Sequence, residues 1–272
     1  MTIRKFPLEA IQKLRNTIQA ELAIANTQTQ LSSWPEPSTE VPEPEFLDDL
    51  SDIFTFGGRS KEERTDFVQR SPWLISPFNP ASVLLKLPGL WLKPGYCLVG
   101  YLYRTASKEA GLIFALPEAL STTAHLQQAL THSTIATPPK PEGAMPHFMA
   151  AIDGDRSAAS FMVASLLKRE LQEFGTRQSS SPPEAIGKRS IWRHHRLIQA
   201  LPSKLPWQWH TEMPKDWFPK ASVLPNGQAA VEFFSCRVSA QEAVMYRHLD
   251  RYPVDGYQPT SSERALAVVR RS

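Results

Sequence analysis

The sequence predicts an α+β protein, in which an antiparallel sheet carries helices on one face and is preceded by a short helix and an acidic, proline-rich linker. A helix with an apolar stripe and marked ends is expected in the middle of the chain, over 157–174. In the C-terminal half, an Asn-Gly dipeptide separates two β-like runs and predicts a hairpin. Strand-like and helix-like segments do not alternate regularly, which argues against a doubly wound parallel fold.

Length and composition limit the class of protein. The 272 residues suffice for one large domain or two small ones, and the net charge of +3 is too small to indicate a nucleic-acid or membrane partner by itself. Two distant cysteines in strand-like runs favour a reducing, cytoplasmic compartment over a disulfide framework. The first residues, MTIRKFPLEA, contain no apolar stretch, so no secretory signal is expected. Lysines and prolines interrupt the longest apolar run, 83–103, so no membrane span is expected.

The first element is expected to be a short amphipathic helix over 8–25, because apolar residues recur at gaps of three and four from Leu8 to Leu22. Pro7 suits the first turn of such a helix. We take residues 1–30 as an N-terminal helical segment.

Residues 31–55 are expected to form an acidic linker that ends in a docking segment. The stretch 31–52 contains four prolines and seven acids but no Lys or Arg, so it cannot bury enough apolar surface to offset its ordering entropy. Its far end alternates acids with large apolar side chains, which suits a segment that folds onto a surface. The residues expected to bind there are Phe46, Leu47, Leu50, Ile53 and Phe54.

The remaining residues, 56–272, are expected to be the α+β body, with a further boundary near 133–152 left open. Two strands, 96–103 and 112–116, are joined by a polar connection and predict an antiparallel hairpin. The other elements expected before the central helix are a helix over 61–69, a helix over 120–130 and a proline-rich loop over 133–146.

The central helix is expected to bury one face against the sheet. Asp155 or Ser157 can cap its first turn, and Gly175 can adopt the left-handed conformation after its end. Lys168 and Gln172 are expected on the opposite, exposed side. The apolar stripe consists of Phe161, Ala164, Leu167, Leu171 and Phe174.

After the central helix, the chain is predicted to be mostly β. Strands over 221–224 and 229–238 flank the Asn-Gly turn. The stretch 243–252 is ambiguous, because the preceding residues 239–242 resemble a helix capping box, whereas the aromatic spacing favours a strand returning beside 229–238. We favour the strand.

A basic segment, 188–196, is the first candidate site and lies within a strand predicted over 190–201. Its cations and histidines surround Trp192, a composition that can bind phosphates and stack a base. In a strand, however, Trp192 and His195 would lie on opposite faces and neither face would be purely basic, which favours the charged flank of an ordinary strand. The candidate residues are Lys188, Arg189, Trp192, Arg193, His194, His195 and Arg196.

His248 and Asp250 form the second candidate site. In a strand they share one face, where Asp250 can hold the imidazole in one tautomer for metal binding or base catalysis. No pair of histidines has a recognised zinc spacing, and the cysteines are not in CxxC pairs, which favours a structural role. We therefore predict no catalytic residue, no metal and no cofactor.

An aromatic cluster is the third candidate and could line a pocket for a flat apolar ligand. Core packing is the favoured explanation, because aromatic side chains bury large areas. The cluster consists of Trp207, Trp209, Trp217, Phe218, Phe233 and Phe234.

The segment LLKRELQEFG (166–175), the later Trp-x-Trp (207–209) and MYRHLDRY (245–252) together resemble a functionally uncharacterised group of cyanobacterial proteins. The resemblance covers roughly the C-terminal half and does not include the acidic linker. It implies a bacterial, cytoplasmic origin and supplies no catalytic residues.

Three functional hypotheses follow. The leading one is a non-enzymatic, cytoplasmic adaptor, assembly or regulatory protein that binds another protein, and residues 1–55 should then be dispensable for folding of the body. The alternative is a ligand-binding protein or enzyme with a sheet-lined pocket that contains His248 and Asp250. The third is nucleic-acid binding through residues 188–196.

Overall fold

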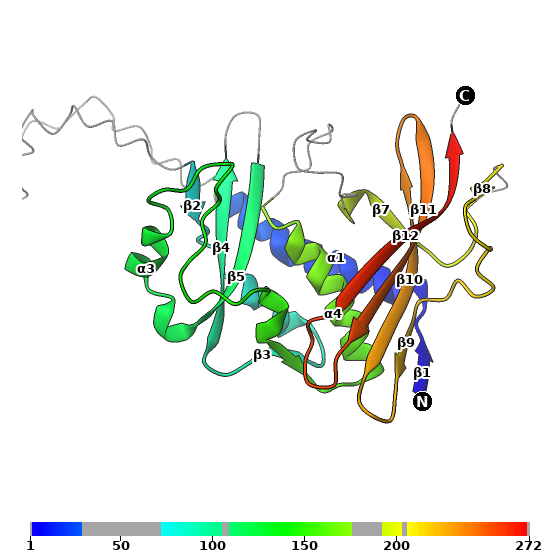
Figure 1. Ribbon diagram of the computed structural model, residues 1–272, viewed down its shortest axis with the longest axis horizontal. Helices are drawn as coiled ribbons and strands as arrows, with labels where there is room; N and C mark the ends of the chain where they lie inside the picture. The colour runs from blue at the N-terminus through cyan, green and yellow to red at the C-terminus, as the bar shows by residue number, and fades with distance from the viewer. Residues whose placement is uncertain (1, 29–71, 105–108, 176–191, 203–205, 271–272) are drawn as a thin grey trace, which may run out of the picture.

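The computed structural model describes residues 2–28, 72–104, 109–175, 192–202 and 206–270. It confirms the predicted α+β class, with an antiparallel seven-stranded sheet, helices packed on it and an N-terminal helix. The central helix α4 (Ala158–Gln172) lies between this sheet and a smaller sheet, and the N-terminal helix α1 (Leu8–Gln28) packs beside it (Figure 1).

The large sheet is built mainly from the C-terminal half of the chain. Its strand order is β1-β9-β10-β11-β12-β8, and β7 pairs with β10 beyond the end of β9. Every pairing in it is antiparallel. The strands are β1 (Thr2–Lys5), β7 (His195–Ile198), β8 (Gln208–Trp209), β9 (Lys220–Val223), β10 (Ala229–Val238), β11 (Glu242–Tyr252) and β12 (Thr260–Arg270).

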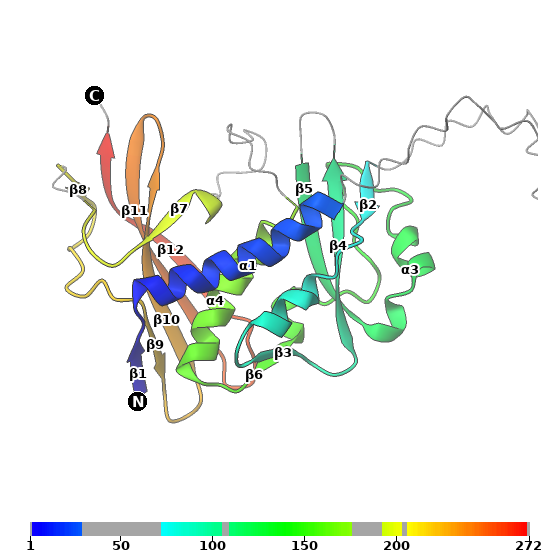
Figure 2. The same cartoon turned by 180° about the vertical axis from the view of Figure 1, so that it is seen from behind.

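Two smaller sheets and several short helices complete the described structure (Figure 2). The hairpin predicted near 96–116 is confirmed as β4 and β5, although β5 begins earlier and leaves a shorter connection. The three-stranded sheet consists of β2 (Trp73–Ile75), β4 (Tyr96–Arg104) and β5 (Glu109–Pro117), and the two-stranded sheet consists of β3 (Leu90–Leu92) and β6 (Ile152–Gly154). The short helices are η2 (Pro80–Lys86), η3 (Glu118–Leu120), α3 (Thr123–Gln128), η4 (Phe148–Ala151) and η5 (Trp192–His194).

The ends of α4 have the predicted local structure. The Ser157 side chain accepts a hydrogen bond from the Ser160 N–H at 3.1 Å, and Gly175 has a φ of +71° just after the helix. The whole predicted stripe is buried, and Gln172 is exposed as expected. The expectation for Lys168 is wrong, because it is only 8% exposed. Elements pack against α4 from more than one side, so charged residues are buried along with the apolar stripe.

The N-terminal segment belongs to the same core as the body. Ile11 and Ile18 on α1 are buried in one cluster with the apolar residues of α4, and β1 pairs with β9 along its whole length. The boundary expected after residue 30 therefore does not separate an independent unit. Removing residues 1–55 would remove an edge strand and a core helix, so this deletion is not expected to leave a folded body.

The turn between β9 and β10 confirms the Asn-Gly prediction. The Gly227 N–H donates to the carbonyl of Leu224 at 2.9 Å, and Gly227 adopts a φ of +86° that favours glycine. The ambiguous stretch 243–252 lies within β11 and pairs with β10 along its length, so the favoured strand is confirmed.

Other predicted elements differ from the structure. The strand expected over 190–201 is split into the 3₁₀ turn η5 and the short strand β7, while the helix expected over 120–130 is reduced to η3, α3 and a turn. Strands β1 and β12 were not predicted. The docking segment 46–54 and the helix expected over 61–69 lie outside the described residues.

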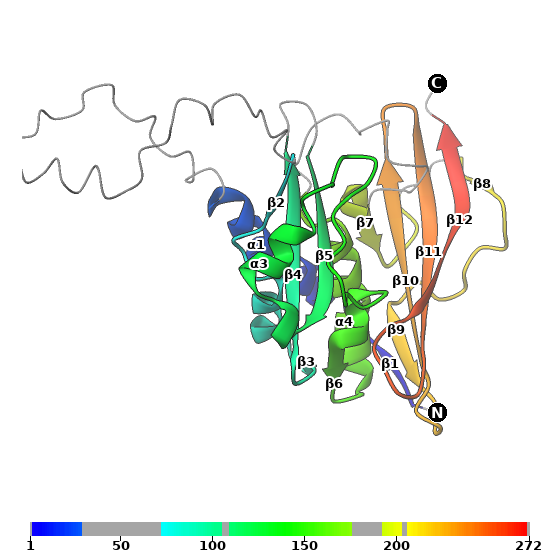
Figure 3. The same cartoon turned by 60° about the vertical axis from the view of Figure 1, so that its left-hand side comes forward.

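The large sheet has two different faces, here called inner and outer. The inner face packs on α4 through buried residues of β10 such as Val231 and Phe233 (Figure 3). The outer face points away from the helices. Near β8 it is covered by tryptophans that pack on Phe234, whereas no described helix lies over the rest of this face (Figure 3). No described helix combines the length and apolar character that crossing a bilayer requires.

Candidate functional site

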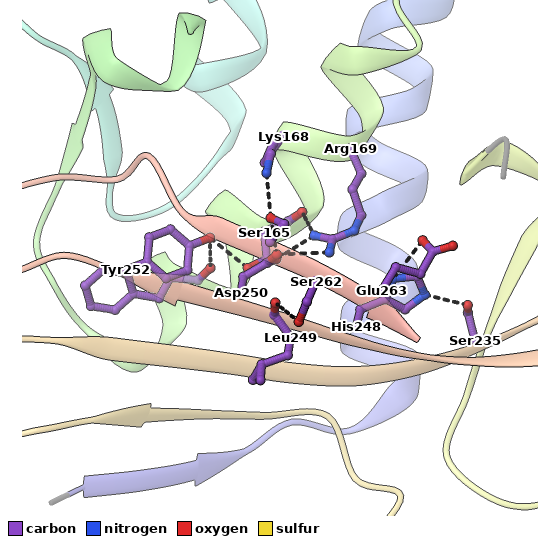
Figure 4. A network of polar contacts seen from close by, with 12 residues as sticks. Ser165, Lys168, Arg169, Ser235, His248, Leu249, Asp250, Tyr252, Ser262 and Glu263 are labelled. Carbon is purple, nitrogen blue, oxygen red and sulfur yellow. Dashed lines mark hydrogen bonds and ion pairs between the residues drawn. The ribbon is translucent and has the colours of Figure 1, made fainter. Parts of the chain in front are cut away.

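His248 and Asp250 lie side by side on β11 and point from the inner face toward α4 (Figure 4). This common direction was expected, because alternate residues of a strand share a face. Both side chains are 0% exposed. They are the centre of a buried polar network that joins α4 to the large sheet.

Asp250 is held by a cation and hydroxyl groups. Arg169 on α4 donates to both of its carboxylate oxygens, at 2.5 and 3.0 Å, and Ser261 on β12 donates at 2.5 Å. Lys168 in turn donates to the Ser261 hydroxyl at 2.5 Å. Burial would raise the pKa of Asp250, but the Arg169 charge and the hydrogen bonds outweigh burial and hold that pKa below its usual value. Asp250 is therefore an ionised, fully occupied carboxylate rather than a free base.

His248 belongs to a row of polar side chains that crosses four strands. Its Nε2 lies 2.7 Å from the Ser235 hydroxyl of β10, and that hydroxyl lies 2.7 Å from Nδ1 of His195 on β7. On the other side, Nδ1 of His248 lies 3.4 Å from Glu263 on β12, the residue directly opposite it in the register. The row follows from the pairing, because residues on adjacent strands that share a face come within reach of one another.

The row has a preferred proton arrangement. The Glu263 carboxylate favours a proton on Nδ1 of His248, which leaves Nε2 to accept from the Ser235 hydroxyl. Ser235 can then accept a hydrogen bond from the Nδ1–H of His195. Burial, and next the charge of Arg169, lower the pKa of His248 well below its ordinary value. Burial and neighbouring arginines lower the pKa of His195 to about 3. Both imidazoles are therefore neutral near pH 7.

A second buried ion pair joins α1 to α4. Arg15 donates through Nε to Glu170 at 2.7 Å, and the Trp192 indole N–H donates to the same carboxylate oxygen at 2.6 Å. Gln19 donates to the other oxygen at 3.1 Å. The Arg15 guanidinium also donates to the backbone carbonyls of Trp192 and His195. This pair fixes η5 and the start of β7 against both helices.

Sequence reasoning missed this second pair. Arg15 follows Ile11 by four residues and precedes Ile18 by three, so it lies on the apolar stripe of α1, and that position was the signal for its burial. Glu170 gave no comparable signal, because a charged residue in a Lys-Arg-Glu run is usually solvated.

The structure places Trp192 inside the network. The indole is 6% exposed, with the guanidinium carbons of Arg15 and Arg169 at 4.5 and 5.6 Å from its ring centre. The 3₁₀ turn puts Trp192 and His195 together, with ring centres 5.6 Å apart, instead of on the opposite faces expected of a strand. A base in solution cannot stack on this indole without displacing the residues that cover it.

The rest of the basic segment does not converge on Trp192. Arg193 pairs with Glu173 at 3.3 Å, while His194 and Arg196 are exposed. Lys188 and Arg189 lie outside the described residues. The structure thus assigns Trp192 and His195 to the interior, and it describes only part of the expected basic surface.

The predicted aromatic cluster is divided by the large sheet. Trp207 and Trp209 pack on the outer face, where Trp217 lies 6.3 Å from Trp209 and 5.0 Å from Phe234 between ring centres. Phe233 points to the inner face and stacks on His248. The two predicted tryptophans therefore do not share a pocket with His248 and Asp250.

The side chains of Ser235, His248 and Glu263 have the order of a hydrolase triad, namely nucleophile, base and acid. Ser235 and His248 are both 0% exposed, however. A shallow hollow of about 170 Å³ beside β2 and β4 does not include these residues. Within the described ranges, no group of three or more His, Cys, Asp or Glu side chains could hold a metal ion.

Comparisons with protein-family models, with curated proteins and with solved structures find no match to this chain.

Proposed function

We propose that this chain is a non-enzymatic cytoplasmic protein whose partner is another protein, in an adaptor, assembly or regulatory role. The observation that carries the proposal is a contrast in solvent exposure. The side chains with catalytic chemistry, His248 and Asp250, are 0% exposed, whereas Leu85 and Trp91 are 86% and 46% exposed.

The buried network has a sufficient structural explanation. It ties α1, α4 and the sheet together through two ion pairs, Arg15–Glu170 and Arg169–Asp250, and each charge in them has a partner. Removing one member of such a pair leaves the other charge buried without a counter-ion, which destabilises the fold. An intact pair fixes the position of each helix relative to the element it contacts. A buried network whose charged groups are paired with one another supports a binding protein better than an enzyme.

Leu85 and Trp91 are the best described candidates for a contact surface. They lie on η2 and β3, which pack against each other, and between them Leu87 and Leu90 anchor the chain in the core. Large apolar side chains on an anchored support suit protein recognition, and tryptophan is enriched among residues that dominate binding energy.

The test compares two double variants of the full-length chain. Leu85→Ser with Trp91→Ala removes the proposed contacts, and Ile135→Ser with Val254→Ser makes a similar change at residues that are 47% and 50% exposed. After thermal melts establish folding, each tagged protein is cross-linked in its native cells and its partners are identified by mass spectrometry. Loss of partners only with the first pair supports the proposal. Partner recovery that is equal for both variants and the wild type contradicts this surface.

The role of the predicted docking segment in binding can be tested by a deletion that keeps the N-terminal strand and helix. Because β1 and α1 belong to the core, residues 31–55 should be removed alone, with a flexible glycine-serine linker in their place. Loss of the same partners would show that the segment contributes to binding.

The alternative of an enzyme keeps one specific observation in its favour, the 2.7 Å approach of Ser235 to His248 beside Glu263. A fluorophosphonate probe labels an activated serine nucleophile. The enzyme hypothesis requires labelling of the wild type that is lost in Ser235→Ala. We expect no labelling of either, because the hydroxyl is buried.

A further inference from the structure

The exposed part of the outer face on β11 and β12 carries an excess of positive charge. On β11, Arg247, Leu249 and Arg251 alternate with the buried inner residues, and Arg264 on β12 shares their outer direction. The Arg247 side chain is 43% exposed, and Arg251 and Arg264 are also exposed. No described helix lies over the outer face of β11 and β12 (Figure 3).

Two of these arginines face each other directly. The register pairs Arg247 with Arg264 across β11 and β12. Like charges directly opposite each other in an antiparallel pair are destabilising. Glu232 pairs with Arg247, so Arg264 is the member of this cross-strand pair whose charge an external anion would balance.

The acids on this face are already used. Asp216 contacts Lys5 at 3.1 Å and Lys220 at 3.5 Å, while Glu232 contacts Lys220 at 2.9 Å and Arg247 at 2.5 Å. These two acids already form ion pairs with three cations. They therefore do not neutralise Arg251 and Arg264.

Among the described residues, Arg251 and Arg264 make no ion pair. Both are exposed, and Arg251 follows Arg247 by four positions on the same strand, a distance of about 13 Å at the usual rise per residue. Arginine side chains can therefore contact an anionic partner at two separate points. One point is Arg251, and the other lies between Arg247 and Arg264.

We propose that this arginine face, formed by Arg247, Arg251 and Arg264, binds an acidic segment of a partner protein. The inference rests on the proposed protein-binding function and specifies the chemistry of the partner. Arginine forks hydrogen-bond carboxylates in pairs, and an extended segment presents carboxylates four residues apart at about the same 13 Å spacing. Leu249, half-buried between the two β11 arginines, offers an apolar contact.

A nucleic acid fits this face less well. Single strands are held by aromatic side chains on which bases stack, whereas the aromatic residues of β11, Tyr246 and Tyr252, lie on the inner face away from these arginines. The whole chain carries a net charge of only +3, which gives weak long-range attraction for a polyanion.

The experiment measures fluorescence anisotropy of a labelled deca-glutamate peptide with the full-length protein. Arg251→Glu with Arg264→Glu reverses the two unpaired arginines, and Lys13→Glu with Lys140→Glu makes the same charge change at exposed lysines elsewhere. We expect binding at low salt that weakens at about 0.5 M salt. The arginine variant should lose about tenfold or more in affinity, against about twofold or less for the lysine control.

Three results would overturn the inference. These are no binding by the wild type at low salt, equal weakening in both variants, or tighter arginine-dependent binding of an oligothymidylate of equal charge, which would assign the face to nucleic acid. Failure here is distinct from failure of the proposed function. If the Leu85 and Trp91 variant loses its partners but deca-glutamate does not bind, the proposed protein-binding function is still supported. Only the proposal for the arginine face is then wrong.

Discussion

Arg169 and Asp250 form a two-point ion pair between the central helix and the middle of the large sheet, and Asp250 has no exposed surface. Replacing Asp250 with Ala would leave the Arg169 guanidinium buried without its counter-ion. We expect the free energy of unfolding to fall by about 3–5 kcal/mol. Chemical denaturation of the wild type and the variant measures this change.

Asp216→Ala is the matched control, because the Asp216 side chain is 31% exposed and pairs with surface lysines. It should cost about 1 kcal/mol or less. The double variant Arg169→Met with Asp250→Leu removes both charges and should recover part of the loss. If Asp250→Ala costs no more than the control, the pair does not hold the helix to the sheet.

The common face of His248 and Asp250 could be predicted because a strand has a side-chain period of two. Local patterns likewise located α4, through its stripe and its Ser157 cap, and the β9–β10 turn, through its glycine. Each of these features depends on residues that are close in the sequence. Sequence reasoning worked where the determining contacts are local.

The partners within the network could not be predicted in this way. Arg15 and Glu170 are 155 positions apart, and Arg169 and Asp250 are 81 apart. No short pattern encodes such pairs, and charged residues on a helix are normally solvated. The 3₁₀ turn at Trp192 was missed for a related reason, because it is held by contacts with Glu170 and Arg15 rather than by its own sequence. Strand β12 lacks a clear alternation in its first, exposed residues.

The apolar face of α4 should be far more sensitive than its exposed side. Leu171 is 2% exposed, so Leu171→Ala should leave a cavity and cost about 2–5 kcal/mol. Gln172→Ala, at an exposed position, should change stability by about 0.5 kcal/mol or less. Denaturant melts of both variants decide the matter. Similar small effects would mean that the stripe is not packed.

Lys168→Ala gives an intermediate expectation. Its ammonium group donates to Ser261, which also donates to Asp250, so the variant should cost about 1–3 kcal/mol through loss of a charged hydrogen bond. Lys168→Met, which keeps most of the aliphatic stem, separates the lost hydrogen bond from lost packing. An effect as small as that of Gln172→Ala would contradict the buried contact.

Stability should decrease as the solution becomes acidic, because histidines that are buried or partly buried in the fold must remain neutral. The pKa of His195 falls to about 3 and that of His147 to about 4, both mainly through burial, from an ordinary value of 6.5. The unfolded chain therefore binds more protons between these values and 6.5. The contribution is complete above pH 6.5 and is lost progressively as the pH falls toward the folded values, by up to about 1.4 kcal/mol per pH unit for each group.

Glutamates oppose this trend at lower pH. Burial raises the pKa values of Glu263 and Glu173 above their ordinary 4.5, so protonating them favours the folded state. The histidine effect is therefore clearest just below pH 6.5. His195→Asn keeps a polar side chain that does not titrate and should flatten the dependence of unfolding free energy on pH. An unchanged slope in that variant would show that His195 is not held neutral.

The end of α4 should tolerate no side chain where β5 passes it. A Cβ on Gly111 would collide with the carbonyl oxygen of Phe174 and with its ring, and backbone atoms cannot move aside cheaply. Gly111→Ala should therefore destabilise the protein by about 1–3 kcal/mol. Gly256→Ala is the control, because the nearest atom to its added Cβ is 4.0 Å away. Thermal melts measure the melting temperature of each variant. If the two melting temperatures differ by less than the measurement error, α4 does not pack this closely on the three-stranded sheet.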